Sequence, residues 1–154
     1  MNYIVILAFL LVYNLFDTSL GYSHTSPLYT HFTYVFQHAS IVHLIANSIS
    51  FISFSNLLGK VTNAFYYPYL IAVLASFASE YDKPTVGASG MVYAMIGMTL
   101  AYACKGDKIK VVDKRKFALM VGLICISIGL GFITGSNNAI HIYSLLIGFI
   151  VIYL

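Results

Sequence analysis

The stretch VFQHASIVHLIANSISFISFSNLL, residues 35–58, decides the class of fold. It contains no Asp, Glu, Lys or Arg, and it exceeds the roughly 20 apolar residues that a helix needs to cross a hydrocarbon core of about 30 Å. Inside hydrocarbon every backbone N–H and C=O must be paired within the protein, which an α-helix achieves by itself. We therefore expect a membrane-spanning helix here.

The composition of the whole chain agrees with that expectation. Its 154 residues are 60% hydrophobic and only 8% charged, with a mean hydropathy of +0.86, whereas a soluble domain carries roughly 25% charged residues. Such a chain cannot cover itself with a water-compatible surface, so its solvent must be a lipid bilayer.

The charged residues and cysteines exclude several functions. The formal charge of +3 is not gathered into a basic stripe with interleaved aromatic residues, so we expect no nucleic-acid partner. Cys104 and Cys125 lie in or beside apolar runs without metal-ligand spacing. We therefore expect neither a disulfide framework nor a metal site.

Six apolar stretches predict six transmembrane helices in an all-α membrane protein, with one domain over residues 1–154. Several stretches are short for a span, which suggests a thin membrane. The predicted spans are Tyr3–Phe16, Val35–Leu58, Phe65–Ser79, Ser89–Cys104, Phe117–Ile133 and Ala139–Tyr153.

The first span has two interpretations, an uncleaved helix or a secretory signal. It lacks a basic n-region, and the following DTSLGYSH offers no A-x-A-like cleavage site. These features favour an uncleaved helix.

The basic residues predict the orientation, because cytoplasmic loops carry an excess of Lys and Arg. Only Lys83 falls in a loop on the other side, between the third and fourth spans. Both termini should therefore face the cytoplasm. The remaining basic residues lie in or beside the loops after the second and fourth spans: Lys60, Lys105, Lys108, Lys110, Lys114, Arg115 and Lys116.

Polar side chains within the spans are functional candidates, because burying them in lipid is costly. In the second span, His43 and Asn47 are four residues apart and share a helix face, while His38 lies on another face or at the helix entrance. Ser89 opens the fourth span, and Tyr93 shares its face. The sixth span contains His141.

Each of these residues alone also has a structural interpretation. The GASG stretch around Ser89 would let helices approach closely. His43, Asn47 and His141 would serve as hydrogen bonds between helices, and Tyr93 would be a packing aromatic. His24 and His31, in the outer loop, would be solvated or interfacial, and Glu80 and Asp82 would belong to a solvated loop.

The shared depth of these polar residues in the membrane favours a catalytic role over a packing role. As a helix, the span from Ser89 to Cys104 would be about 24 Å long, shorter than the hydrocarbon core of about 30 Å. Ser89 should therefore lie recessed below the outer surface, beside protein or a wet cavity. His141, His43 and Asn47 follow other outer loops closely. A serine, an imidazole and hydrogen-bond donors at one depth are the parts of a nucleophilic hydrolase.

Small residues should allow the serine and the imidazole to meet. Gly90, Ala94 and Gly97 form a stripe on the fourth span, and Ser144 and Gly148 form one on the sixth. Such stripes permit close helix contact.

The chain resembles the rhomboid family of intramembrane serine proteases over nearly its whole length. The resemblance rests on three motifs in the family's order: HASIVHLIAN in the second span, GASG followed by MVYAMIG in the fourth, and HIYSLLIG in the sixth.

The resemblance implies a role for each matching residue. Ser89 would be the nucleophile and His141 the general base, forming a dyad without a carboxylate. His43, Asn47 and the backbone N–H of Ser89 would form the oxyanion hole. Tyr93 would stack on His141, Gly87 would shape the oxyanion loop, and His38 would be a structural, hydrogen-bonding residue nearby.

The family also implies partners and location. The substrates would be transmembrane proteins cleaved in or near a membrane segment, with a small residue before the scissile bond and no cofactor. A basic six-span form without an appendage favours a prokaryotic inner membrane.

Two features depart from the family pattern. The outer loop usually carries a Trp-Arg pair where this chain has Tyr29 and Thr30, which puts the conformation of that loop in question. The sixth span has Ser144 where a glycine is usual.

Two other functions compete with proteolysis. A rhomboid-like protein that binds transmembrane helices without cleaving them would be expected to lack the serine or the histidine, and both are present. A small transporter would be expected to show charged spans or inverted repeats, and neither is evident.

Overall fold

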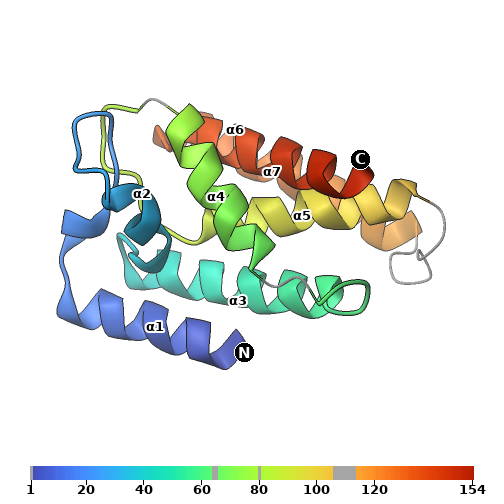
Figure 1. The fold of residues 1–154 in the computed structure, drawn as a ribbon, viewed down its shortest axis with the longest axis horizontal. Coiled ribbons are helices and arrows are strands. Elements are labelled where there is room, and N and C mark those ends of the chain that lie inside the picture. Colours follow the sequence, from blue (N-terminus) through green and yellow to red (C-terminus); the bar gives the residue numbers. More distant parts are fainter. Residues whose placement is uncertain (1, 64–65, 80, 106–113) are drawn as a thin grey trace.

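The computed structural model describes residues 2–63, 66–79, 81–105 and 114–154 of the chain (Figure 1). The predicted loop residues Glu80, Lys108 and Lys110 lie outside these ranges. Within them, six longer helices are α1 (Asn2–Leu15), α3 (Ile41–Leu58), α4 (Tyr67–Ala78), α5 (Ser89–Cys104), α6 (Lys114–Thr134) and α7 (Asn138–Tyr153). The described residues form no strand, only an isolated β-bridge between Tyr22 and Thr85. The predicted all-helical class is confirmed.

Helix α5 is the central element of the bundle, with α3, α4 and α7 packed against it (Figure 1). Eleven of its residues are buried, whereas α1 buries only Phe9. The N- and C-termini lie at the same end of the bundle (Figure 1). The centre of the bundle therefore holds the helix that begins with Ser89.

The outer faces of the helices are apolar. Tyr3 and Ile133 are each 82% exposed, and Val42 is 73% exposed. Large exposed apolar surfaces of this kind are unfavourable in water, so the perimeter suits a lipid environment.

Among the described residues, α3 is the one helix long and apolar enough to span a membrane by itself, with a mean hydropathy of 1.5. The apolar part of α6, Phe117–Ile133, and the other apolar helices are shorter than α3.

Helix α3 begins later than predicted. The predicted span starts at Val35, but the helix starts at Ile41, after a separate 3₁₀ turn η2 (Tyr34–Phe36). Ser40 is extended, with φ −157° and ψ 162°, and its side chain accepts a hydrogen bond from the His43 N–H. This N-cap sets the start of the helix. His38 consequently lies at the helix entrance, one of its two predicted positions.

The segment between α1 and α3, residues 16–40, is called the first loop. It contains η1 (Thr18–Leu20), α2 (Thr30–Thr33) and η2. At the positions where the family carries Trp-Arg, Thr30 is fully buried and its hydroxyl donates to the Pro27 carbonyl at 2.6 Å, while Tyr29 is exposed. The first loop is therefore folded without the Trp-Arg pair.

His31 anchors the first loop on α4 and is half-buried there, so it is not a freely solvated side chain; an interfacial position stays a prediction. Its ring stacks on Phe77 at 4.2 Å, and its Nδ1 lies 2.9 Å from the Ser76 hydroxyl. Burial lowers the pKa of His31 below its ordinary value of 6.5. The neutral imidazole is thus the form that suits this contact.

Candidate active site

Ser89 is the first residue of α5, and Gly87 sets the turn that leads into it. The φ of Gly87 is +115°, in a region that residues with a side chain rarely adopt. A Cβ on Gly87 would also lie 2.7 Å from Cε1 of His43. Glycine is therefore needed at this position both for backbone conformation and for space.

Ser89 and His141 are in hydrogen-bond contact. The Ser89 Oγ lies 2.9 Å from Nε2 of His141, although the two residues are on different helices. The distance falls within the range expected of a nucleophile and its base. The structure thus brings together the two residues that the sequence predicts as a dyad.

The imidazole of His141 is held by stacking on Tyr93. The two ring centroids are 4.5 Å apart and the planes differ by 11°, an arrangement typical of a packed aromatic pair. Within the described ranges, Nδ1 of His141 has no hydrogen-bond partner. No carboxylate among those residues therefore orients the ring.

His43 and Asn47 lie across the site from α7, on the first turns of α3. The Ala39 N–H donates to Nδ1 of His43 at 3.4 Å. In a neutral imidazole, an accepting Nδ1 leaves the proton on Nε2. The Nε2 atom lies 2.8 Å from the position of a Cβ on Gly87, so this donor lies beside the backbone that precedes Ser89.

The side-chain amide of Asn47 lies beside the same backbone, next to Gly87. Its Nδ2 donates to the His43 carbonyl at 3.0 Å and lies 3.6 Å from the Gly87 Cβ position. The first turn of a helix also leaves backbone N–H groups without intrahelical acceptors, and the N-cap residue Ala88 makes no side-chain cap bond in α5. The His43 ring N–H, the Asn47 amide N–H and the backbone N–H groups at the start of α5 therefore all lie near Ser89.

These side chains line a cavity of about 820 Å³, whose walls come from α3, α5, α6, α7 and the loops that precede α5 and α7. Ser89 and His141 are half-buried within it. Leu123, Ile124 and Ser127 of α6 form part of the opposite wall. The cavity is large enough to admit several residues of an extended peptide.

His38 lies behind His43 and does not line this cavity. It is 3% exposed, and its ring contacts Phe9 at 5.1 Å and His43 at 5.3 Å. Neither ring nitrogen has a hydrogen-bond partner among the described residues. Its contacts are therefore those of ring packing behind His43.

A second polar cluster, two members of which line the same cavity as the serine and the histidine, was missed by sequence reasoning. Tyr22, Ser79, Thr85 and Asn137 are all buried, and their side chains are hydrogen-bonded to one another. The available signal was Asn137, because an Asn directly before an apolar run is typical of a helix N-cap. Nothing in the sequence indicates its partners.

The apolar outer faces of this helical bundle suit a membrane protein, and its central cavity contains a serine, two histidines and an asparagine. The Rhomboid domain family model matches residues 25–154, and the chain belongs to the rhomboid family. Members of this family are typically serine intramembrane proteases.

The chain is also similar to a protein of Acanthamoeba polyphaga mimivirus that is named as a rhomboid protein. The two are 25% identical over 165 aligned residues, which cover 100% of this chain and 91% of that protein. The similarity therefore extends to α1, which precedes the residues that the family model matches.

Proposed function

We propose that this protein is an intramembrane serine endopeptidase that cleaves a peptide bond in or near the transmembrane segment of another membrane protein. The observation that carries the proposal is the 2.9 Å contact between Ser89 Oγ and His141 Nε2. Family membership supports it, and so does the position of both residues in a cavity that also contains His43 and Asn47.

In the proposed reaction the Ser89 oxygen attacks the carbonyl carbon of the scissile bond. His141 Nε2 accepts the hydroxyl proton and returns it to the leaving amine, which leaves an acyl-enzyme on Ser89. Water, activated by the same imidazole, then hydrolyses the ester. This chemistry uses only side chains, backbone and water.

The developing oxyanion would be stabilised by three donors. These are Nε2–H of His43, the Asn47 amide and the backbone N–H of Ser89, where the first turn of α5 adds a favourable helix dipole. Tyr93 would keep the His141 ring in the plane that meets Ser89.

For the membrane arrangement we propose six spans with both termini on the cytoplasmic side. The placement of both termini at one end of the bundle supports this orientation (Figure 1), as does the concentration of basic residues in two loops. The prokaryotic inner membrane stays a prediction from the sequence. The mimiviral relative shows that similar chains also occur outside prokaryotes.

A catalytically silent protein that binds transmembrane helices is the alternative. Such a protein has no need to hold an imidazole in contact with a serine hydroxyl. The preserved contact between Ser89 and His141 therefore favours the protease.

The test is cleavage of a transmembrane model substrate in proteoliposomes. We expect Ser89→Ala and His141→Ala each to lower the rate by about 10³-fold or more, because the two residues act as a unit. Ser53→Ala is the matched control. Its hydroxyl donates to the Ile49 carbonyl on the exposed face of α3 and is outside the cavity. Cleavage that survives Ser89→Ala would overturn the proposal.

A fluorophosphonate probe that labels activated serines gives a second readout without a substrate. Wild type should be labelled at Ser89, and Ser89→Ala should not. A folded wild type that neither cleaves nor is labelled would favour the binding alternative.

A further inference from the structure

The buried polar cluster joins four segments that are distant in sequence, and two of its members, Thr85 and Asn137, also line the cavity. Nδ2 of Asn137 lies 2.8 Å from the Tyr22 hydroxyl, 2.8 Å from the Ser79 hydroxyl and 2.9 Å from Oγ1 of Thr85. The Tyr22 hydroxyl also donates to Ser79 at 3.1 Å. These residues come from the first loop, the end of α4, the α4–α5 loop and the N-cap of α7.

Thr85 and Asn137 have the same spacing in sequence to the two proposed catalytic residues. Thr85 precedes Ser89 by four residues, and Asn137 precedes His141 by four. Their side chains meet at 2.9 Å, as do those of Ser89 and His141. The two contacts are therefore successive links between the same two segments, four residues apart along each.

The same side chains also fix the backbone on each side. Oδ1 of Asn137 accepts from the Ile140 N–H at 3.4 Å and caps α7. Thr85 and Tyr22 exchange two backbone hydrogen bonds, at 2.7 and 3.1 Å. The segment that leads into Ser89 and the segment that leads into His141 are therefore each held by hydrogen bonds, four residues before the proposed catalytic side chain.

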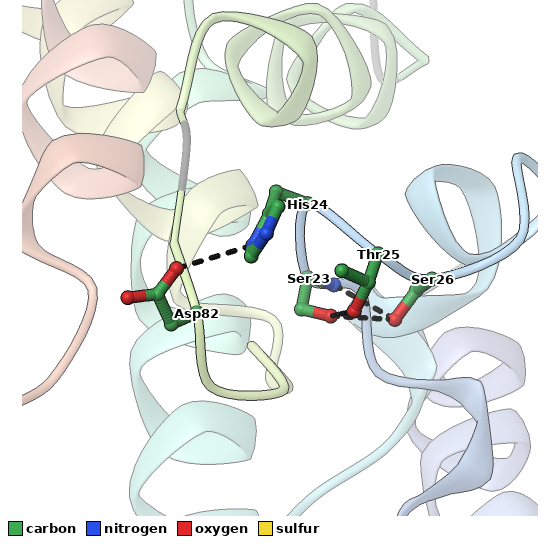
Figure 2. A network of polar contacts seen from close by, with 5 residues as sticks. All are labelled: Ser23, His24, Thr25, Ser26 and Asp82. Carbon is green, nitrogen blue, oxygen red and sulfur yellow. Dashed lines mark hydrogen bonds and ion pairs between the residues drawn. The ribbon is translucent and has the colours of Figure 1, made fainter.

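A second contact joins the first loop to the α4–α5 loop, but it is exposed. Figure 2 shows His24 facing Asp82 across the two loops, 3.1 Å apart, beside the hydrogen-bonded hydroxyls of Ser23, Thr25 and Ser26. The Asp82 side chain is 94% exposed. Exposed ion pairs contribute little and are screened by salt, so the buried cluster is the stronger connection.

We propose that Thr85 and Asn137 are positioning residues that set the distance between Ser89 and His141. The proposal rests on the protease function argued above. Catalysis by a nucleophile and base is sensitive to small displacements, since a misplacement of about 1 Å can cost about 10²-fold in rate. Losing the outer link should therefore lower kcat while the substrate continues to bind.

The variant that tests this is Thr85→Val, which keeps the shape of the side chain and removes only the hydroxyl. Thr85→Ser should restore the contact, because it keeps the hydroxyl. Asn137→Ser is a second variant. Serine preserves an N-cap of α7 but is too short to reach Thr85.

The matched control is Thr99→Val. Thr99 is 3% exposed on α5, and its hydroxyl donates to the Met95 carbonyl at 2.7 Å, away from the cluster. It loses one buried hydroxyl whose hydrogen bond lies within α5, so no link between the two segments is removed. Its effect measures what the loss of a buried threonine hydroxyl does to the fold alone.

We expect Thr85→Val to lower kcat, and the rate of fluorophosphonate labelling, by about tenfold, with KM changed by less than about twofold. Thr85→Ser and Thr99→Val should stay within about twofold of wild type in kcat. An unchanged kcat in Thr85→Val, a change confined to KM, or an equal loss in Thr99→Val would overturn the proposal.

Hydrogen–deuterium exchange separates this proposal from the protease function. In Thr85→Val, amide exchange should rise both in residues 86–90 and in the first turn of α7. An increase confined to residues 86–90 would show that the link does not hold α7. This readout decides the question even if wild type proves to be inactive as a protease.

Discussion

The glycines of two regions of this bundle differ in what surrounds them. At the α5–α7 interface, a Cβ on Gly97 would overlap the Leu145 carbonyl, and one on Gly148 would overlap the Ala94 carbonyl. On α6, by contrast, a Cβ on Gly122 or Gly129 would meet nothing within 4 Å. The backbones of α5 and α7 are in direct contact, whereas these two positions of α6 are open.

The close approach of α5 and α7 is what allows Ser89 and His141 to meet. Helices that carry side chains at their contact are held about 8–10 Å apart. Small residues at the α5–α7 interface allow a shorter separation, and a short serine side chain on one helix can then reach an imidazole on the other. Of the residues in the predicted stripes, Ala94, Gly97 and Gly148 lie at this contact.

The largest effect should come from filling the interface. Gly97→Val places a branched side chain where the Leu145 carbonyl lies, so α5 and α7 must separate. We expect loss of the folded bundle and of all measurable cleavage. Gly129→Val is the matched control on α6 and should keep both. Thermal unfolding in detergent and proteoliposome cleavage measure the two outcomes, and a folded, active Gly97→Val protein would contradict the comparison.

Removing an oxyanion donor should have the next largest effect. Asn47 lies on α3, across the cavity from the interface, and its side chain is not needed for helix contact there. We expect Asn47→Ala to lower kcat by about 10²–10³-fold while the melting temperature changes little.

Asn56→Ala is the control for that experiment. Asn56 is on the same helix but accepts a hydrogen bond from Asn2 at the exposed end of α3, away from the cavity. Its kcat should stay close to that of wild type. Equal losses in the two variants would show that α3 contributes to stability and not to the reaction.

Lowering the pH should reduce the catalytic rate without disturbing the packing of α5 against α7. Only the neutral His141 imidazole can accept the Ser89 proton, so kcat should fall about tenfold for each pH unit below the pKa of His141. The contacts of Gly97 and Gly148 involve only backbone and apolar groups, so the α5–α7 interface should not respond over the same range. A pH–rate profile that is flat down to pH 3, in protein that stays folded, would exclude His141 as the base.

The packing and the candidate site were largely predictable, because each depends on local sequence. Small residues three or four apart mark a helix face, and the serine and histidine lie within recognisable motifs. The start of α3 was misjudged because apolar residues continue through η2, and the Ser40 cap, not hydropathy, ends the loop.

Contacts between distant segments could not be predicted in the same way. His31 lies in the first loop, and nothing near it in the sequence indicates that its ring stacks on Phe77 of α4. Asn137 and Thr85 are 52 residues apart in sequence. Nothing local to either residue indicates the other, since their meeting depends on how α7 packs beside α5.

The smallest effect should come from the exposed link between the first loop and the α4–α5 loop. Asp82→Asn removes the ion pair with His24, but both groups are largely in solvent, where such pairs contribute about 0–1 kcal/mol. We expect kcat within about twofold of wild type, with any difference disappearing at high salt. The buried Thr85→Val change between neighbouring segments should be several times larger. If Asp82→Asn proved as damaging as Thr85→Val at low salt, surface charge would have to contribute to holding Ser89 against His141, and the distinction between buried and exposed links would fail.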